Sequence, residues 1–578
     1  MKGTSRRVKI VVAIFVLFWA GLFVRVIQVQ LVRWKHFEAE ARKQHWDRVE
    51  LNARRGRVFD RMGRALTLNH TSATVQILPQ HVRDKEAGKD TLAAILAEYG
   101  LGSRREIRSR LGKYDHLFRL ARGVEYAVAD ELKDVLVDRQ FHNCTLVDDE
   151  DKRIYPYGEV CANVVGFMGS EQGRAGIEAR FDSVLRGIQG SVLLQRDAVG
   201  HCLPYPSYPR TEPVEGADIR LTLDADIQSI CHEAVKKQVR ETGALAGSAV
   251  VLCARTGAVL AMADIPTYDP ARRRRGDTLY FQSAAACDEF EPGSSFKPVI
   301  GLAVLESPLA RRLTARMYDV SAGEIEVSGR KVKDVHKHGI LDFDGLFSLS
   351  SNVGCVMLSF SVDPERFFLV ARGLGFDNPV GIDLPGEAAG SIDPPEKLNR
   401  LRLANNAFGQ GLTVTLLQLA AAYNCIANDG QYVKPYLVES VELRGRGLCR
   451  SGRTEVRRAV KEESAQRMKD ILAKVVTEGT GELAAIDGAT VCGKTGTAQK
   501  VIPGVGYSST ASMMSFVGFF PRERPKYVVA VLIDEPSKFR FASAAACPVF
   551  RKIGEGLLAL ELMRERQEYV AEIAGDIR

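Results

Sequence analysis

Apolar and polar positions follow several patterns along this chain, and the longest apolar run lies near its start. Residues 10–24 (IVVAIFVLFWAGLFV) are uniformly apolar, and RVIQVQLV extends the run to Val32 with one arginine and two glutamines. About 20 apolar residues are needed for a helix to span a bilayer. Because Arg25 lies toward the far end, where a long side chain can reach the interface, we expect a transmembrane anchor over residues 10–32.

The residues around this run predict its orientation. Lys2, Arg6, Arg7 and Lys9 precede it without an acidic residue, and positive charge of this kind is retained on the cytoplasmic side. Because no small-x-small cleavage site follows, we favour an uncleaved anchor over a removed signal peptide. Residues 1–9 are then a cytoplasmic tail of a single-pass protein of the inner (cytoplasmic) membrane. The bulk of the chain is expected to be extracytoplasmic, or periplasmic.

The patterns between residues 33 and 215 are mixed and carry no chemical signature. Residues 53–69 predict two strands around a polar turn at Asp60–Gly63. Residues 80–140 are charge-rich and helix-like, and residues 153–191 are glycine-rich with short helical pieces. We therefore expect a non-catalytic domain over residues 33–215.

The patterns change from about residue 214 onward. Helical periodicity covers residues 226–241 and 412–429, and two apolar runs within 247–265 predict a hairpin. A polar hairpin is expected at 323–335, and three strand-like runs (ATVCGKTGTAQK, MMSFVGFF and KYVVAVLIDE) precede a closing helix from about Pro548. Strands at both ends with helices between them predict an α+β domain over residues 216–578.

Composition and charge limit the possible functions. The chain has 578 residues, 46% hydrophobic and 26% charged, which is typical of a globular protein with two or more domains. Its net charge is +8, but no basic patch is interleaved with aromatic residues, so we expect no nucleic acid partner. The longest basic run, Arg272–Arg275, is interpreted as a solvated loop, with a weak contact to an anionic polymer as the alternative.

The cysteines indicate neither a disulfide framework nor a metal site. There are 11, an odd number, scattered without a C-x-x-C motif. Several lie in apolar surroundings, such as Cys253 and Cys425, and are interpreted as small buried hydrophobic residues. So many thiols are unusual in an oxidising compartment, which counts mildly against an extracytoplasmic location. We expect no metal and no cofactor.

The segment EPGSSFKP places two serines and a lysine at the start of an apolar helix. Pro298 is tolerated only in about the first helical turn, so we expect the helix to start at about Ser294–Ser295. Ser294 and Lys297 then lie on one face, where a neutral amine can take the hydroxyl proton. A plain serine cap with a solvated lysine is the alternative, and the spacing recurs at Ser328 and Lys331 in a turn without a helix.

Two further motifs favour a catalytic interpretation. SLSSNVG supplies Ser350 and Asn352 in a predicted loop between helices, and CGKTGTA supplies Lys494, Thr495, Gly496 and Thr497 on a predicted strand. Together with Ser294 and Lys297 they form the S-x-x-K, S-x-N and K-T-G set of active-serine penicilloyl enzymes, in that order.

On these motifs the chain resembles a class B penicillin-binding protein, a membrane-anchored peptidoglycan D,D-transpeptidase. The resemblance covers nearly the whole chain and includes RRGRVFDRMGRAL, GRAGIEARFDSVLRG, PTYDP, GIDLPGE and FGQGLTVTLLQLAAAYNCIANDG. The segment EAEARKQHWDRVELNARRGRVFDR is most similar to the septal, FtsI-like branch. Met62 and Ser295 stand where the family usually has Asn and Thr, and neither change touches the chemistry. The resemblance implies an elongated pedestal (dimerisation-like) domain, then a transpeptidase domain with an antiparallel sheet flanked by helices.

The resemblance also implies the catalytic roles. Ser294 would attack the carbonyl of the penultimate D-alanine of a stem peptide, with Lys297 as the general base. Ser350 would relay a proton toward the leaving D-alanine. Asn352 would hold the peptide amide and orient Lys297. An amine of a neighbouring stem peptide would then attack the acyl-enzyme and form a cross-link.

Substrate binding is implied for the K-T-G strand. Lys494, expected to be charged, and Thr495 would bind the terminal carboxylate, and the backbone N–H groups of Ser294 and Thr497 would form the oxyanion hole. A side chain at Gly496 would block the approach of substrate to the strand. β-Lactams would acylate Ser294 covalently. Simple structural roles for Ser350, Asn352 and Thr495 are the alternatives.

Other functions share part of this chemistry. β-Lactam hydrolysis needs a base for deacylation, and the anchor and pedestal argue against it. A β-lactam-binding scaffold or sensor without turnover would not need the intact catalytic set. The sequence leaves septal, elongation and sporulation roles open. The expected partners are stem peptides, β-lactams, the membrane, a glycosyltransferase and other divisome membrane proteins.

Overall fold

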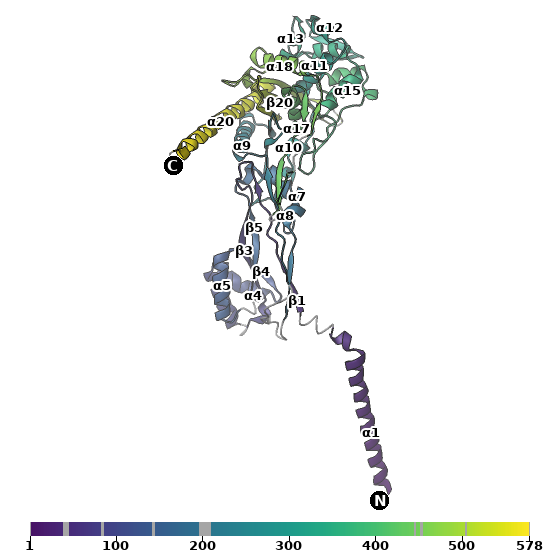
Figure 1. The fold of residues 1–578 in the computed structure, drawn as a ribbon, viewed down its shortest axis with the longest axis vertical. Coiled ribbons are helices and arrows are strands. Elements are labelled where there is room, and N and C mark those ends of the chain that lie inside the picture. Colours follow the sequence, from purple (N-terminus) through teal and green to yellow (C-terminus); the bar gives the residue numbers. More distant parts are fainter. Residues whose placement is uncertain are drawn as a thin grey trace. The chain divides into compact units, whose positions relative to one another are not determined.

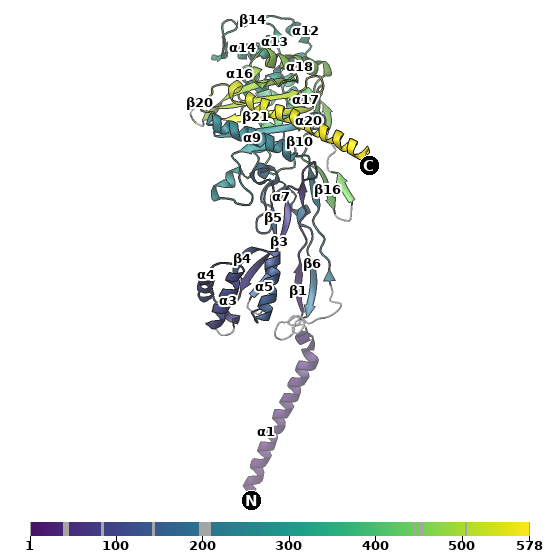
Figure 2. The same ribbon diagram turned by 90° about the vertical axis from the view of Figure 1, so that its left-hand side faces the viewer.

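The chain folds into two compact units. A computed structural model describes residues 2–38, 46–82, 86–141, 145–195, 210–443, 447–450, 455–502, 504 and 506–576. One unit comprises Met1–Arg55 with Arg186–Gly216, and the other comprises Gly56–Leu185 with Ala217–Arg578. Figures 1 and 2 show the elements of both units from two directions.

The first unit contains the predicted apolar helix. Helix α1 (Lys2–Ile27) continues into a π-helical turn (Gln28–Val32), and Val8–Val32 is long and apolar enough to cross a membrane. The prediction of an N-terminal apolar helix is confirmed. The unit also holds an antiparallel sheet of β1 (Trp46–Leu51), β6 (Gly190–Gln195) and β7 (Arg210–Thr211), in which Trp46 lies opposite Gln195.

A small α+β module within the second unit spans residues 68–154. Its antiparallel sheet has the order β4-β3-β5, from β3 (Leu68–Ile77), β4 (Phe118–Glu125) and β5 (Thr145–Ile154). Its helices are α3 (Ala87–Glu98), α4 (Arg104–Lys113) and α5 (Tyr126–Asp138). The expectation of helix throughout 80–140 is wrong for β4, where Phe118, Leu120 and Val124 are buried and charged residues alternate with them.

The segment 56–68 joins this module to the second half of the chain. β2 (Val58–Phe59) pairs in parallel with β8 (Asp218–Leu221), in a sheet completed by β16 (Val438–Leu443) and β17 (Gly447–Arg450). The predicted turn at Asp60–Gly63 is present, because Asp60 Oδ1 accepts hydrogen bonds from the backbone N–H groups of Met62 and Arg64.

Charged side chains reinforce this junction. The Arg64 guanidinium contacts Asp60 (2.7 Å) and Asp226 (2.6 Å). Arg564, near the C-terminus, contacts Asp226 (2.8 Å) and the buried Asp224 (2.7 Å). These ion pairs connect the turn at Asp60 with Asp226 and Arg564, which are distant in the sequence.

A five-stranded antiparallel sheet forms the centre of the second unit, with the order β10-β9-β21-β20-β19. The strands are β9 (Ala246–Cys253), β10 (Val259–Ile265), β19 (Cys492–Ile502), β20 (Gly506–Phe520) and β21 (Tyr527–Asp534). The hairpin predicted at 247–265 and the three late strands are confirmed.

Helices cover both faces of this sheet, which explains why its strands are apolar on both sides. Val250 and Leu252 of β9 pack with α11 (Lys297–Leu305) and α17 (Leu416–Ala427). Ala249 and Val251 face α9 (Ala225–Thr242) and α20 (Cys547–Asp576). The predicted α+β fold, an antiparallel sheet flanked by helices, is therefore confirmed (Figure 2).

Shorter elements complete the second unit. The remaining α-helices are α6 (Ala162–Val165), α7 (Gly176–Arg180), α8 (Asp182–Arg186), α10 (Ala284–Cys287), α12 (Ala310–Thr314), α13 (Phe343–Ser348), α14 (Asn352–Ser359), α15 (Pro364–Gly373), α16 (Arg400–Asn406), α18 (Glu462–Thr477) and α19 (Ala542–Ala545). Three two-stranded sheets pair β11 (Tyr318–Asp319) with β14 (Ile340–Leu341), β12 (Glu324–Val327) with β13 (Arg330–Lys333), and β15 (Gln431–Val433) with β18 (Val456–Arg458).

Candidate active site

Ser294 lies in a 3-10 turn directly before α11. A 3-10 turn (Gly293–Phe296) precedes the α-helix, which begins at Lys297 with Pro298 in its first turn. The helical conformation thus starts about where the position of Pro298 predicts, although its first turn is 3-10. Gly293 has φ +57°, and a Cβ there would lie 2.7 Å from the Thr497 carbonyl oxygen. Only glycine fits this position, which brings Ser294 against β19.

Ser350 lies between α13 and α14, in the inter-helix loop that was predicted. Its φ of +62° is left-handed, and the following N–H of Ser351 donates to the Leu346 carbonyl (2.9 Å). This pairing closes α13 as a left-handed C-cap does. The Lys297 amine donates to the Ser350 carbonyl (2.6 Å) and lies 3.2 Å from Ser350 Oγ. The first two motifs are therefore in direct contact.

Asn352 begins α14, and its N-terminus is held by a residue that the sequence analysis missed. Asp334, just after β13, accepts from the backbone N–H groups of Asn352 and Val353 and from Ser351 Oγ (2.8 Å). The Asn352 side-chain amide donates to the Lys333 carbonyl (2.9 Å). A carboxylate at a helix N-terminus is favourable. Asp334 was missed because its contacts lie 17–19 residues away in sequence.

Lys494 of β19 is the second lysine that contacts Ser350. Its amine lies 3.0 Å from Ser350 Oγ and 3.3 Å from Thr495 Oγ1. Thr480, in the loop after α18, places its hydroxyl 2.8 Å from Thr495 Oγ1 and 3.4 Å from the Lys494 amine. Thr480 is a second residue that the sequence analysis missed, since a lone threonine in a loop carries no pattern.

Gly496 has a different structural reason from the one expected. A Cβ there would lie 2.4 Å from Ser515 Oγ, 2.6 Å from the Pro292 carbonyl oxygen and 2.9 Å from Ser295 Oγ. These atoms belong to the neighbouring strand and to the segment that carries the serine motif. Glycine is thus required for β19 to pack against the turn of Ser294. Thr497, one residue further, is exposed, and its Oγ1 accepts from the Ala542 N–H (3.3 Å).

Both lysine amines are completely buried. Burial lowers the pKa of Lys297, opposed by the nearby Cys355 and Asp334. Burial, together with the positive charge of Lys297, holds the pKa of Lys494 well below its usual range. The expectation that Lys494 stays charged does not fit these surroundings, because burial and the adjacent Lys297 both disfavour its ammonium form.

The arrangement suits acyl transfer by a serine nucleophile. Ser294 is partly exposed, and a buried amine with a lowered pKa follows three residues later. The second S-x-x-K sequence lacks these features, since Ser328 is exposed in the β12–β13 turn and the Lys331 amine is paired with Glu324 (2.6 Å). The contacts of Ser350 bring together all three predicted motifs. Ser328 and Lys331 do not take part in these contacts.

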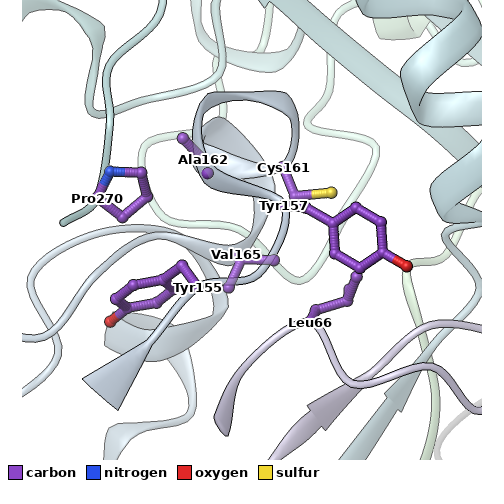
Figure 3. Close-up of a pocket in the computed structure, with 8 residues that line it drawn as sticks. Leu66, Tyr155, Tyr157, Cys161, Ala162, Val165 and Pro270 are labelled. Atoms are coloured by element: carbon purple, nitrogen blue, oxygen red, sulfur yellow. The ribbon is translucent and has the colours of Figure 1, made fainter. Parts of the chain in front are cut away.

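Other candidate sites do not compete with this one. Figure 3 shows a small recess lined by Leu66, Tyr155, Tyr157, Gly158, Cys161, Ala162, Val165 and Pro270, none of which belongs to the three motifs. Burial raises the pKa of the Cys355 thiol to about 11 and that of Cys492 to about 12, so neither is poised as a thiolate. Among the described residues, no group of three or more His, Cys, Asp or Glu side chains is arranged to hold a metal ion.

Comparison with known proteins gives consistent matches. Residues 247–555 match the penicillin binding protein transpeptidase domain, and residues 50–221 match the penicillin-binding protein dimerisation domain. Penicillin-binding protein PbpB of Mycolicibacterium smegmatis is 32% identical, over 93% of this chain and 87% of that protein. The probable peptidoglycan D,D-transpeptidase PenA of Neisseria meningitidis is 31% identical, over 96% and 93%. Penicillin binding protein 3 from Mycobacterium tuberculosis, solved in complex with aztreonam, superposes with a TM-score of 0.68 at 29% identity, over 89% of this chain and 97% of that one.

Proposed function

Since this chain belongs to the penicillin-binding protein transpeptidase family, as its motifs suggested, we propose that it cross-links peptidoglycan through an acyl-enzyme at Ser294. Its class of enzyme is peptidoglycan D,D-transpeptidase. The observation that carries the assignment of residues is the contact of both Lys297 and Lys494 with Ser350 Oγ, at 3.2 and 3.0 Å.

The first half-reaction forms the acyl-enzyme. Neutral Lys297 takes the proton of Ser294 Oγ, which attacks the carbonyl carbon of the penultimate D-alanine of a stem peptide. The backbone N–H groups of Ser294 and Thr497 bind the oxyanion, and such a donor is worth about 2.7–4 kcal/mol. The C–N bond then breaks, and the departing D-alanine amine receives a proton through Ser350.

The second half-reaction transfers the acyl group. An amine of a neighbouring stem peptide attacks the ester carbonyl carbon and loses a proton to the same base. The bond between that carbon and Ser294 Oγ then breaks, and Ser294 Oγ recovers the proton from the base. Lys494 and Thr495 bind the donor's terminal carboxylate, while Asn352 holds the donor's peptide amide. β-Lactams acylate Ser294 in the same way, and the relative solved with aztreonam supports that part of the proposal.

The location and the cellular role are also proposals. The helix Val8–Val32 supports a membrane anchor, and the positive charges of Lys2, Arg6 and Arg7 before it favour a cytoplasmic N-terminus. We assign the enzyme to septal wall synthesis, together with a glycosyltransferase and other divisome membrane proteins. Similarity to the stage V sporulation protein D of Bacillus subtilis (30% identity over 88% of this chain) keeps a sporulation role as the alternative.

A turnover assay tests the reaction. The full chain in detergent is incubated with a donor pentapeptide ending in D-Ala-D-Ala and a labelled D-amino acid as acceptor. We expect release of D-alanine and an equal amount of labelled product, both absent in Ser294→Ala. Release of D-alanine without labelled product would indicate a hydrolase, and absence of turnover despite penicillin binding would indicate a sensor.

A further inference from the structure

The four consecutive arginines, Arg272–Arg275, lie in a loop that is fixed at both ends. The Thr267 hydroxyl donates to Asn163 Oδ1 (2.7 Å), and Asn163 Nδ2 donates to the Tyr280 carbonyl (2.8 Å). Asn163 itself is buried. One buried amide therefore holds the two ends of residues 267–280, which is called the arginine loop below.

The two nearest acidic residues bind the backbone instead of the guanidinium groups. Asp269 Oδ1 accepts from the Ala271 N–H (2.9 Å), and Asp277 Oδ2 accepts from the Arg274 N–H (2.6 Å). All four arginines are exposed, and within the described part of the chain none of them is paired with a carboxylate, although the Arg273 guanidinium donates to the Pro270 carbonyl. The loop thus presents four guanidinium charges without neutralising them.

Arg273 is further positioned by aromatic packing. Its guanidinium lies 4.2 Å from the ring centroid of Phe167, which is 5% exposed and packs edge-on against Tyr268 and Phe281. Such a cation–π contact limits the freedom of the side chain. Pro270, at the base of the loop, forms one wall of the recess in Figure 3. A loop that served only for solubility would need neither the hydrogen bonds of Asn163 nor the contact between Arg273 and Phe167.

We propose that the arginine loop is a docking site for the carboxylate-bearing cell-wall polymer, separate from the site around Ser294. This proposal rests on the proposed function, because stem peptides of polymeric peptidoglycan carry free carboxylates that complement four cations without a carboxylate partner in the loop. Each exposed ion pair contributes little, so one carboxylate would not be held. A polymer with many carboxylates engages several arginines together, and each contact after the first is intramolecular.

The loop and Ser294 belong to the same compact unit. A strand held by the loop is therefore kept at high local concentration near the enzyme that modifies it, without occupying the catalytic serine. The loop would then favour polymer over short free stem peptides as substrate.

The test compares two charge-matched triple variants of the full chain, each held in phosphatidylcholine nanodiscs and acylated with penicillin beforehand. Arg272→Gln, Arg274→Gln and Arg275→Gln alter the loop but keep Arg273 on Phe167. Arg311→Gln, Arg312→Gln and Arg330→Gln remove three other exposed arginines as the control. Co-sedimentation with insoluble peptidoglycan is measured at low and high salt, beside peptidoglycan with amidated carboxylates and phosphatidylglycerol vesicles.

We expect about tenfold weaker binding of the loop variant, since each of three exposed contacts is worth only a few-fold. The control variant should bind as the unaltered chain does, and amidation or high salt should weaken binding of the unaltered chain. Unchanged binding by the loop variant, equal loss in the control, or stronger binding to the vesicles than to peptidoglycan would overturn the proposal. Loss of penicillin acylation in the unaltered chain would instead contradict the proposed function.

Discussion

Lys297 and Lys494 are both buried and both contact Ser350 Oγ, but their surroundings differ. Lys297 also donates to the Ser350 backbone carbonyl and lies near Asp334, whereas Lys494 is surrounded by the hydroxyl groups of Thr480 and Thr495. Lys297 is therefore suited to act as a base next to the nucleophile. Lys494 needs a substrate carboxylate to restore its charge, since an anion beside a buried amine raises its pKa.

Replacing Lys297 with arginine should lower the rate of penicillin acylation by roughly 10²–10⁴-fold, the usual contribution of a general base. A guanidinium keeps the charge but does not lose its proton in proteins. In the unaltered enzyme the neutral fraction of Lys297 increases as pH rises through its lowered pKa, so acylation should increase with pH there. The second-order rate constant of acylation, measured against pH, checks both effects. If the acylation rate constant of Lys297→Arg still increased with pH over the same range, a residue other than Lys297 would be the general base.

Replacing Lys494 with arginine should reduce acylation less than Lys297→Arg does. The guanidinium still offers donors to a carboxylate, although it is larger than the fully buried amine that it replaces. The same rate constant, compared with the thermal midpoint of each variant, separates a loss of chemistry from a loss of packing. A larger loss at Lys494 in a normally stable variant would contradict this division of roles.

At the scale of elements, strong local sequence patterns were sufficient to predict many of the helices and strands. The hairpin at 247–265, helix α9 and the polar hairpin β12–β13 follow from local apolar periodicity and turn residues. Strand β4 was missed because Arg122 and Gly123 interrupt the alternation of Phe118, Leu120 and Val124. Asp334 and Thr480 were missed for a different reason, since their roles depend on contacts between segments that are distant in sequence.

The close packing of β19 against the turn of Ser294 gives an element-scale prediction. Gly496→Ala should destabilise the protein by about 1–3 kcal/mol, as overpacking does, because its Cβ would meet Pro292 and Ser515 within 2.6 Å. Acylation should fall with it, because β19 moves away from Ser294. Gly339→Ala is the matched control, since a Cβ there meets nothing within 4 Å. Thermal unfolding and acylation are measured for both, and equal stability of the two variants would refute the packing role.

At the scale of the whole molecule, the compact units divide the chain differently from the linear domains expected at 33–215 and 216–578. Gly56–Leu185 belongs with Ala217–Arg578, because β2 pairs with β8 and Arg64 contacts Asp226. Such pairings between distant segments are not visible in local sequence patterns. The predicted domain bounds stay a prediction, and the matched family regions, 50–221 and 247–555, leave a gap between them.

The orientation in the membrane is a second prediction at this scale. With four positive charges before residue 10 and no acid among them, the N-terminus should stay in the cytoplasm and the C-terminus should lie outside. A reporter enzyme that is active only outside the cytoplasm, fused after residue 578, should be active. Activity of a cytoplasm-dependent reporter at the same position, with silence of the first, would reverse the topology.

The most direct test of the account is to map the residue that penicillin acylates. Labelled penicillin is incubated with the full chain and with Ser294→Ala and Ser328→Ala, and intact mass is followed by peptide mapping of the adduct. We predict one adduct, on the peptide that contains Ser294, retained in Ser328→Ala and absent from Ser294→Ala. Labelling that persists in Ser294→Ala, or an adduct on any other serine, would contradict the central claim.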